Sequence, residues 1–389
     1  MICKKNIALF FVAIVLAAPM LFLNGFTLFH KVLLSISELI ALSGFFFVSK
    51  NVKLRGASTV IVVIFFYFIF NVFFNAFLCK WPSSQIMVAL IESLWWLLVF
   101  LFAYVLSQLR LLDVTLLSHK MIVAIVFSVS FLVLFQIIYA DRLDFFTSNF
   151  AYLPLLLLPY IFLQKNKKIR VICFSLVMIS VFLSMKRTAI IAFVCAFLAI
   201  FLSNILREKK KNMFMSVFYL LFVLASFYNV NSYLEGNVLY RFSNVVEDGG
   251  SGRTEIYSAV INRFFNLDFD SQLFGRGHNM VRMDRVFEIN TTKERITLSA
   301  HNDFLEVLYD YGYVGILLYF VLLFKISRLC LFWRNKNKEY YHALLTSFVI
   351  TICVSLFSHL VIYPTYFANL TLLWAVMENE RNKLELVYG

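Results

Sequence analysis

Long apolar runs recur along almost the whole chain of 389 residues, and they restrict what it can fold into. A helix rises about 1.5 Å per residue, so about 20 apolar residues cross the roughly 30 Å hydrocarbon core of a bilayer. The alternation expected of barrel strands is absent, and we therefore predict an all-α integral membrane protein with about twelve transmembrane helices. The runs lie near residues 6–23, 28–49, 57–77, 86–107, 121–139, 148–163, 171–186, 188–206, 213–229, 313–333, 341–362 and 366–378.

Composition excludes several other classes of protein. Hydrophobic residues make up 61% of the chain and charged residues 15%, against about a quarter charged in soluble domains. The 35 Lys and Arg exceed the 22 Asp and Glu, but we expect no nucleic-acid partner because these charges follow the membrane topology. The six Cys form no CxxC pair, so neither a disulfide framework nor a zinc site is predicted.

The positive charges also predict the orientation. With the N-terminus in the cytoplasm, 22 of the 35 Lys and Arg lie inside, and eight of the other 13 lie in one long outer segment. Cytoplasmic loops are normally the basic ones, so we predict a multi-pass protein with both termini in the cytoplasm.

One predicted outer connection, residues 229–311, is too long for a simple loop between helices. It divides the chain into helices one to nine (1–228), an outer loop with short helices (229–311), and helices ten to twelve with a cytoplasmic C-terminus (312–389). Loops held on a rigid scaffold often carry function, so we expect the active site here.

Two cations lie at a predicted outer boundary of the membrane. In Ser184-Met185-Lys186-Arg187-Thr188, Lys186 and Arg187 lie at the ends of two spans that almost no loop separates. They either extend to lipid headgroups or form an anion clamp for a lipid-linked phosphate or diphosphate.

A glycine-rich turn, Gly249-Gly250-Ser251-Gly252-Arg253-Thr254-Glu255, precedes a predicted helix in the long connection. Ser251 or Thr254 is the expected N-cap. Arg253 at this helix start is either a phosphate ligand or an ordinary surface charge. The apolar face of the helix comprises Ile256, Ala259, Val260 and Phe264.

His301 lies just before the tenth predicted span. We expect Asn302 to cap a short helix whose Phe304, Leu308 and Tyr311 face the membrane. A neutral imidazole, with a reference pKa of about 6.5, is a competent general base for a sugar hydroxyl. The alternative is a loop histidine that only makes hydrogen bonds.

Several polar residues fall in the outer halves of predicted spans. Polar groups in lipid are costly unless they face one another or a cavity, so they predict a polar chamber open to the outer leaflet. They are Asn71, Asn75, Glu92, Gln136 and His359, while Glu38 lies deeper.

These features together resemble the O-antigen ligase and polymerase superfamily, the Wzy/WaaL-type membrane glycosyltransferases. The family pattern is His, then Asn, Ser or Gln, nine residues, Gly, two residues, and Gly, Thr or Tyr. Four residues of this chain fill it without a gap: His301, Asn302, Gly312 and Gly315.

Two further motifs support the resemblance. Arg187-Thr188 resembles the family's Arg-Thr motif at a span end, although Ala192 stands where the family has Leu. Arg253 occupies the place of the family's loop arginine, and Arg276 belongs to a stretch, Leu273-Phe274-Gly275-Arg276-Gly277, like the one that often follows it.

The resemblance implies polymerisation of undecaprenyl-diphosphate-linked repeat units into O-antigen or capsular polysaccharide at the periplasmic face of a bacterial inner membrane. The transfer would invert the anomeric carbon without a metal or other cofactor. His301 would remove the acceptor proton, while Arg187 and Arg253, assisted by Lys186, would neutralise the departing diphosphate. Expected partners are the carrier-linked glycan, membrane lipid, and the chain-length regulator and flippase of the same pathway.

The residues at two places agree with metal independence. The first predicted outer loop, residues 24–30, contains no carboxylate, and Asp268-Phe269-Asp270 matches the metal-binding DxD motif in letters only, a frequent chance occurrence.

Two alternatives stay open. A ligase would move the finished glycan to lipid A-core; the Lys186-Arg187 pair and the abundance of Phe, Ile, Lys and Asn resemble repeat-unit polymerases instead. A transporter of lipid-linked sugars is disfavoured because the five Pro show no paired arrangement and the polar residues gather on one side.

Overall fold

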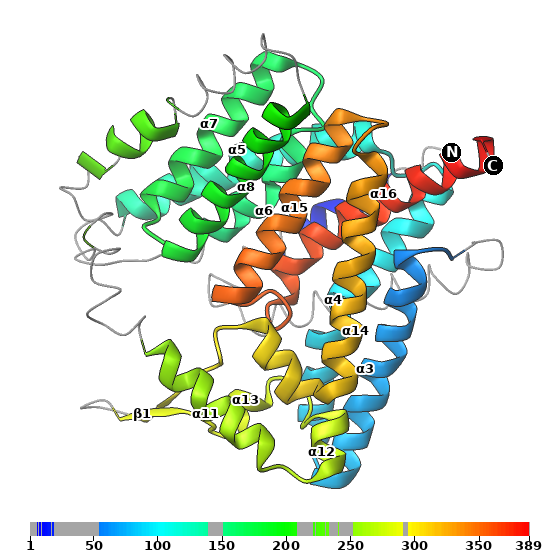
Figure 1. The fold of residues 1–389 in the computed structure, drawn as a ribbon, viewed down its shortest axis with the longest axis vertical. Helices are drawn as coiled ribbons and strands as arrows, with labels where there is room; N and C mark the ends of the chain where they lie inside the picture. Colours follow the sequence, from blue (N-terminus) through cyan, green and yellow to red (C-terminus); the bar gives the residue numbers. More distant parts are fainter. Residues whose placement is uncertain are drawn as a thin grey trace. The chain divides into compact units, whose positions relative to one another are not determined.

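The computed structural model describes residues 6, 8, 10–16, 18, 54–138, 151–207, 221, 223–229, 231–232, 240, 252–290 and 295–388. Over these residues the chain is helical apart from its turns and one antiparallel pair of strands, β1 (Glu288–Asn290) and β2 (Arg295–Thr297) (Figure 1). Six of the described helices are long and apolar enough to cross a membrane, which confirms an all-α membrane protein. These six are fewer than the roughly twelve transmembrane helices predicted. The predicted span 28–49 lies outside the described residues.

The chain forms two compact units that do not follow its linear order. The first unit comprises Met1–Leu112, Asp248–Leu329 and Ser355–Gly389, and the second comprises Asp113–Glu247 and Cys330–Val354. The predicted boundaries at 228/229 and 311/312 describe membrane topology and stay a prediction.

Among the described residues, four long helices belong to the first unit, and α4 packs against two of the others. Helix α4 (Ser83–Gln108) packs against α3 (Ala57–Cys79) and α16 (Pro364–Tyr388). Thr371 on α16 donates a hydrogen bond to the carbonyl of Trp96 on α4, at 3.1 Å. Helix α14 (Asp303–Trp333) begins in this unit and continues into the second one.

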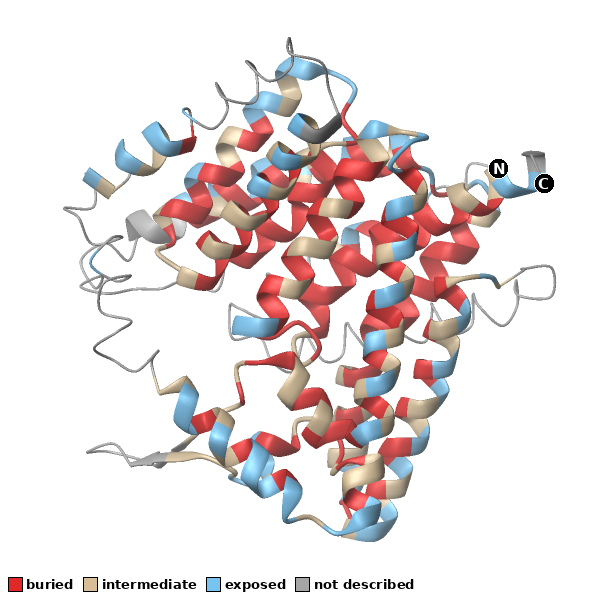
Figure 2. Ribbon diagram, in the orientation of Figure 1, coloured by how far each residue is buried: buried red, intermediate tan, exposed pale blue. Residues whose placement is uncertain are grey.

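Helices α3 and α14 each carry an exposed apolar stripe, visible as pale blue patches in Figure 2. The residues recur every three or four positions, so each stripe follows one helix face. Large apolar faces of this kind are rare on soluble monomers, whereas lipid solvates them. They are Phe66, Phe70, Phe73 and Phe77 on α3, and Tyr313, Leu317, Phe320 and Phe324 on α14.

The second unit is a helical bundle of α5 (Val114–Ile138), α6 (Tyr152–Ile161), α7 (Lys167–Leu183), α8 (Arg187–Arg207) and most of α15 (Lys338–Phe357). Asn166 caps α7 by accepting the N–H groups of Lys168 and Ile169. Helix α6 differs from the predicted span over 148–163, because its ten residues cover only about 15 Å.

Short helices occupy the described part of residues 229–311, as predicted: α11 (Arg253–Phe265), α12 (Phe269–Phe274) and α13 (Met280–Met283). Three residues of the predicted apolar face of α11, Ile256, Val260 and Phe264, are buried in a core that they share with Val72 and Trp81. The fourth, Ala259, is only partly buried. The predicted capping by Thr254 is wrong, because Gly252 is the N-cap, with φ 71°, and Thr254 lies exposed inside the helix. Ser251 lies outside the described residues.

Candidate functional site

His301 lies immediately before α14 in an unusual backbone conformation. Its φ of 54° is in the left-handed region, which residues with a side chain seldom adopt outside sites that constrain them. Asn302 caps the helix as predicted, because its Oδ1 accepts the N–H groups of Phe304 and Leu305 at 2.9 and 3.2 Å. Its amide also donates to the carbonyl of Leu356 at 3.1 Å. These contacts fix the backbone on which His301 is carried.

A second histidine stands beside the first. The ring centroids of His301 and His359 are 4.8 Å apart, and His359 Nδ1 lies 4.0 Å from Glu306 Oε1. The side chains of His359 and Glu306 are only 1% and 2% exposed. A separation of 4.0 Å exceeds hydrogen-bond length, so Glu306 and His359 are close neighbours that do not share a direct hydrogen bond. The three side chains form a row that leads from half-buried His301 into the interior.

Asp303 holds the two histidine-bearing segments together. Its buried carboxylate accepts hydrogen bonds from Ser355 Oγ at 2.8 Å, from the N–H of Leu360 at 2.8 Å and from the N–H of Val361 at 3.2 Å. The connection after α15, which carries His359, is thereby fixed to the first turn of α14. Asp303 was not predicted from the sequence, where the available signal was an acid in the first turn of an apolar helix.

Tyr363 closes the same connection. Burial raises the pKa of its hydroxyl, the negative charges of Glu306 and Glu92 act in the same direction, and Arg282 opposes them. Tyr363 therefore stays a neutral hydrogen-bond donor at physiological pH. The interactions also show that Arg282, an exposed cation that the sequence analysis did not single out, lies within electrostatic reach of this part of the site.

Arg253 and His301 belong to the same unit and are linked through Tyr257. Arg253 is the first residue of α11, and Tyr257 follows one turn later on the same helix face. The hydroxyl of Tyr257 lies 3.4 Å from the carbonyl oxygen of His301 and 3.3 Å from that of Leu356. The face of α11 that carries Arg253 is therefore directed at the His301 segment.

The two glycine motifs pack directly against each other. Gly312 (φ 66°) interrupts α14, and Gly275 (φ 80°) ends α12. A Cβ at Gly312 would lie 2.4 Å from the carbonyl oxygen of Leu273, and one at Gly275 would lie 2.3 Å from that of Asp310. The N–H of Gly277 also donates to Asp310 O at 2.8 Å. Segments that the sequence showed as separate motifs thus form one backbone contact.

Gly315 is required by the same kink. A Cβ at this position would lie 2.2 Å from the Cβ of Tyr311. The predicted orientation of Tyr311 toward the membrane is wrong, because its ring is 1% exposed and stacks on Phe68 at 4.0 Å. Its hydroxyl lies 2.8 Å from Nδ1 of His278. Tyr311 therefore belongs to the interior beneath the site.

Several of the polar residues that were predicted to line a chamber make contacts within the protein. Asn71 donates to the carbonyl of Phe274, and Asn75 donates to the carbonyl of Asn71 at 3.0 Å. Glu92 Oε2 lies 3.5 Å from Nε2 of His278. The side chain of Gln136, like Glu38, lies outside the described residues.

Arg276 takes part in a local network. Its Nε lies 3.2 Å from Asp284 Oδ2, which also accepts the hydroxyl of Tyr309 at 2.9 Å. Burial opposes the charge on Arg276, but the neighbouring carboxylate outweighs it and raises the pKa of the guanidinium. Arg276 thus has a structural contact with Asp284. Its binding of substrate stays a prediction.

Lys186 and Arg187 lie in the second unit. Helix α7 ends at Leu183 and α8 begins at Arg187, so the short connection is as predicted. Lys186 Nζ lies over the ring of Tyr152, 5.7 Å from its centroid. Both cations are half-buried, and their convergence with His301 stays a prediction.

The acidic residues outside the histidine site do not form a metal centre in the described part of the chain. Asp268 caps α12 by accepting the N–H of Ser271 at 3.1 Å, and its hydrogen bonds to Ser271 lower the pKa of the carboxyl. Among the described residues, no three His, Cys, Asp or Glu side chains are placed to hold a metal ion. The first outer loop, 24–30, lies outside them, and metal independence stays a prediction.

Comparison with known proteins finds a match to a family model. A family model described as O-Antigen ligase matches residues 171–320, the segment that contains Lys186, Arg187, Arg253, His301 and both motif glycines. No curated protein matches the chain. The match over residues 171–320 supports the O-antigen ligase/polymerase superfamily.

Proposed function

We propose that this protein is a membrane glycosyltransferase that polymerises undecaprenyl-diphosphate-linked repeat units into O-antigen or capsular polysaccharide. The observation that supports this most is the environment of His301, held in a left-handed conformation next to His359 and in contact with Tyr257 of the helix that begins with Arg253. We place the reaction at the periplasmic face of the inner membrane.

In this reaction the imidazole of His301 accepts the proton of an acceptor sugar hydroxyl. The acceptor oxygen attacks the anomeric carbon of the donor glycan, and the bond from that carbon to the diphosphate oxygen breaks. Attack occurs on the face opposite the leaving group, so the configuration inverts. The lipid diphosphate departs with the bonding electron pair, and the proton rests on His301 until solvent or product removes it.

The diphosphate gains negative charge as it leaves, and cations that meet it there lower the barrier. Arg253 presents a planar guanidinium suited to phosphate oxygens, next to the N–H groups at the start of α11. Arg187 and Lys186 supply further charge in this proposal. Arg276 contributes through the segment it stabilises, and Asn302 by fixing the His301 backbone.

The polymerase is preferred over the ligase on the Lys186-Arg187 pair and the Phe-, Ile-, Lys- and Asn-rich composition. The ligase is the second candidate because the matching family carries that description. The two share donor chemistry and differ in the acceptor. In a deletion strain, one repeat unit left on lipid A-core supports the polymerase, whereas bare core with long chains still on the carrier supports the ligase.

Purified full-length protein and a defined lipid-linked repeat unit test the proposal directly. We expect a ladder of products of increasing length, and we expect it to form also in the presence of a chelator. Activity that vanishes with chelator and returns with Mg²⁺ or Mn²⁺ would contradict the metal-independent mechanism. Movement of the substrate across liposome membranes without a new glycosidic bond would indicate that the protein is a transporter and not an enzyme.

A further inference from the structure

The turn between α11 and α12 carries large apolar side chains on its surface, within the pale blue region of Figure 2 at this turn. Ile261, Phe265 and Phe269 are 38%, 61% and 72% exposed, and we call these three side chains the apolar corner. Ile261 and Phe265 stand one turn apart on α11, and Phe269 begins α12. The amide of Gln272 fixes the turn, because it donates to the carbonyls of Phe265 and Leu267 at 3.1 and 2.9 Å.

On one side the apolar corner adjoins the exposed stripe of α3 (Figure 1). The ring of Phe274, at the end of α12, packs edge-on against Phe70 and Phe74, with centroids 5.5 and 5.2 Å apart. Phe70 belongs to the exposed stripe. Phe70 and Phe74 lie nine and five residues before the end of α3 at Cys79, or about 14 and 8 Å along its axis. Helix α12 therefore ends beside the membrane span and not beyond it.

On the other side the apolar corner adjoins the stripe of α14. Phe264, which directly precedes Phe265 and is buried, packs edge-on against Tyr313, with ring centroids 5.2 Å apart. Tyr313 is the first residue of the α14 stripe and follows the kink at Gly312. The segment that carries the corner thus contacts both of the faces that lipid is expected to cover. Continuity of exposed apolar surface over several elements is typical of a membrane contact.

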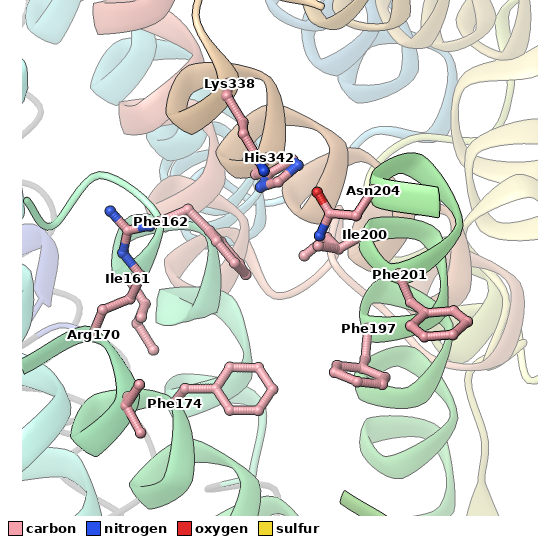
Figure 3. A pocket seen from close by; sticks show the side chains of 11 residues that line it. Ile161, Phe162, Arg170, Phe174, Phe197, Ile200, Phe201, Asn204, Lys338 and His342 are labelled. Carbon is pink, nitrogen blue, oxygen red and sulfur yellow. The ribbon is translucent and has the colours of Figure 1, made fainter. Parts of the chain in front are cut away.

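Phenylalanine side chains are not directed outward throughout this chain. In the second unit, Phe174 and Phe197 are buried and line a cavity of about 200 Å³, with ring centroids 6.0 Å apart (Figure 3). The exposure of Phe265 and Phe269 is therefore a property of their positions and not a consequence of the high Phe content.

Polar side chains surround the apolar corner. Asn262, Arg263, Asn266 and Asp270 are exposed. Charged groups are costly in the centre of a bilayer, whereas the interface accommodates a polar face beside an apolar one. Aromatic side chains are also enriched at this level of the membrane. The composition of the corner therefore matches the boundary between headgroups and acyl chains.

We propose that the apolar corner inserts into the outer leaflet of the membrane, at the boundary between headgroups and acyl chains, and fixes the end of α11 to the lipid surface. The same helix begins with Arg253, and its Tyr257 contacts the backbone of His301. The lipid contact therefore sets the position of this helix relative to the membrane. The choice of leaflet follows from the predicted topology. The proposal does not depend on the glycosyltransferase reaction.

Tryptophan fluorescence tests the surroundings of the corner. Full-length Phe265→Trp and Phe269→Trp proteins are placed in phosphatidylcholine nanodiscs whose acyl chains carry bromine close to the headgroup, bromine near the chain end, or no bromine. The five native Trp are common to all variants, so subtraction of the wild-type emission isolates the added residue. Interfacial helices are buried by about 5–10 Å, so bromine close to the headgroup should quench the added emission more than bromine near the chain end. Acrylamide, a quencher dissolved in the water, should have little effect.

Two control variants define the range of the measurement. Phe73→Trp, in the exposed stripe of α3, should be quenched by brominated lipid. Glu255→Trp lies in the first turn of α11, ten residues before Phe265 or about 15 Å along the helix, and should be quenched by acrylamide instead. All four positions are exposed, so the melting temperatures should stay close to that of the wild type.

Quenching of Phe265→Trp and Phe269→Trp by acrylamide, as expected for Glu255→Trp, would overturn the proposal. Emission from both corner variants that neither acrylamide nor brominated lipid quenches would also overturn it, because protein and not lipid would then cover the corner.

Discussion

The imidazole rings of His301 and His359 lie with their centroids 4.8 Å apart, although one histidine precedes α14 and the other follows α15. Behind His359 stands the buried carboxyl of Glu306, 4.0 Å from Nδ1. A cation that forms on His359 is therefore close to a carboxyl group that is only 2% exposed to water. The proposed base therefore lies next to His359, which is not part of the family pattern of His301 and Asn302.

His359 and Glu306 are expected to act as positioning residues. His359→Gln or Glu306→Gln should lower kcat by about tenfold, less than the roughly 10²–10⁴-fold typical of removing a general base. Glu306→Gln keeps an oxygen that can accept the N–H of Ala300. Steady-state kinetics should show an unchanged KM for the lipid-linked donor. An equal loss through KM, with kcat intact, would indicate a role in substrate binding instead.

Asp303 is expected to be essential for stability. Asp303→Ala would leave the N–H groups of Leu360 and Val361 and the hydroxyl of Ser355 without their buried acceptor, at about 1–3 kcal/mol for each. Asp303→Asn keeps one acceptor oxygen and should be milder. Thermal unfolding in detergent measures both, with the exposed Asp270→Ala as control. Equal melting temperatures for Asp303→Ala and the control would refute the role of this clamp.

Gly312 and Gly252 can be compared to test the close backbone contact of Gly312 with Leu273. Their φ angles are similar, 66° and 71°, but a Cβ at Gly312 meets the backbone at 2.4 Å, whereas one at Gly252 meets only a side-chain oxygen of Glu255 at 3.9 Å. Gly252→Ala should therefore cost about 1–2 kcal/mol of backbone strain, and Gly312→Ala considerably more. Denaturation curves of the two variants measure the loss in the free energy of unfolding. Equal losses would show that the close approach of Gly312 to Leu273 does not matter for stability.

Tyr363 predicts a specific dependence of stability on pH. Because its pKa is raised in the folded state, its contribution is fully present below the unfolded value of about 10 and is lost as the pH rises through the folded value. Wild-type stability should thus decline more steeply above about pH 10 than that of Tyr363→Phe. Melting curves of both proteins across the alkaline range provide the measurement. Parallel curves would mean that burial of Tyr363 does not suppress its ionisation.

The helices were predictable from the sequence because lipid requires long apolar runs, and this requirement is local. The cap at Asn302 was also predictable, because it depends on one residue type at one position. The capping of α11 was mispredicted because Gly252, with no side chain to donate or accept, occupies the cap in a left-handed conformation.

The support of His301 could not be predicted in the same way. Asp303, Tyr257 and His359 act through contacts between segments that are distant along the chain, and nothing in their local sequence reveals the partner. The burial of Tyr311 has the same origin, because the kink at Gly312 turns it toward Phe68 and His278. Periodicity alone assigned it to the lipid-facing side.

The most direct test of the account is the rate of glycosidic-bond formation by purified His301→Ala. We predict a loss of at least about 10²-fold relative to the wild type, with an unchanged melting temperature, because the proton acceptor is gone. His119→Ala, which alters an exposed histidine of α5, should retain full activity. A His301→Ala protein that assembles the glycan at the wild-type rate would contradict the proposed mechanism.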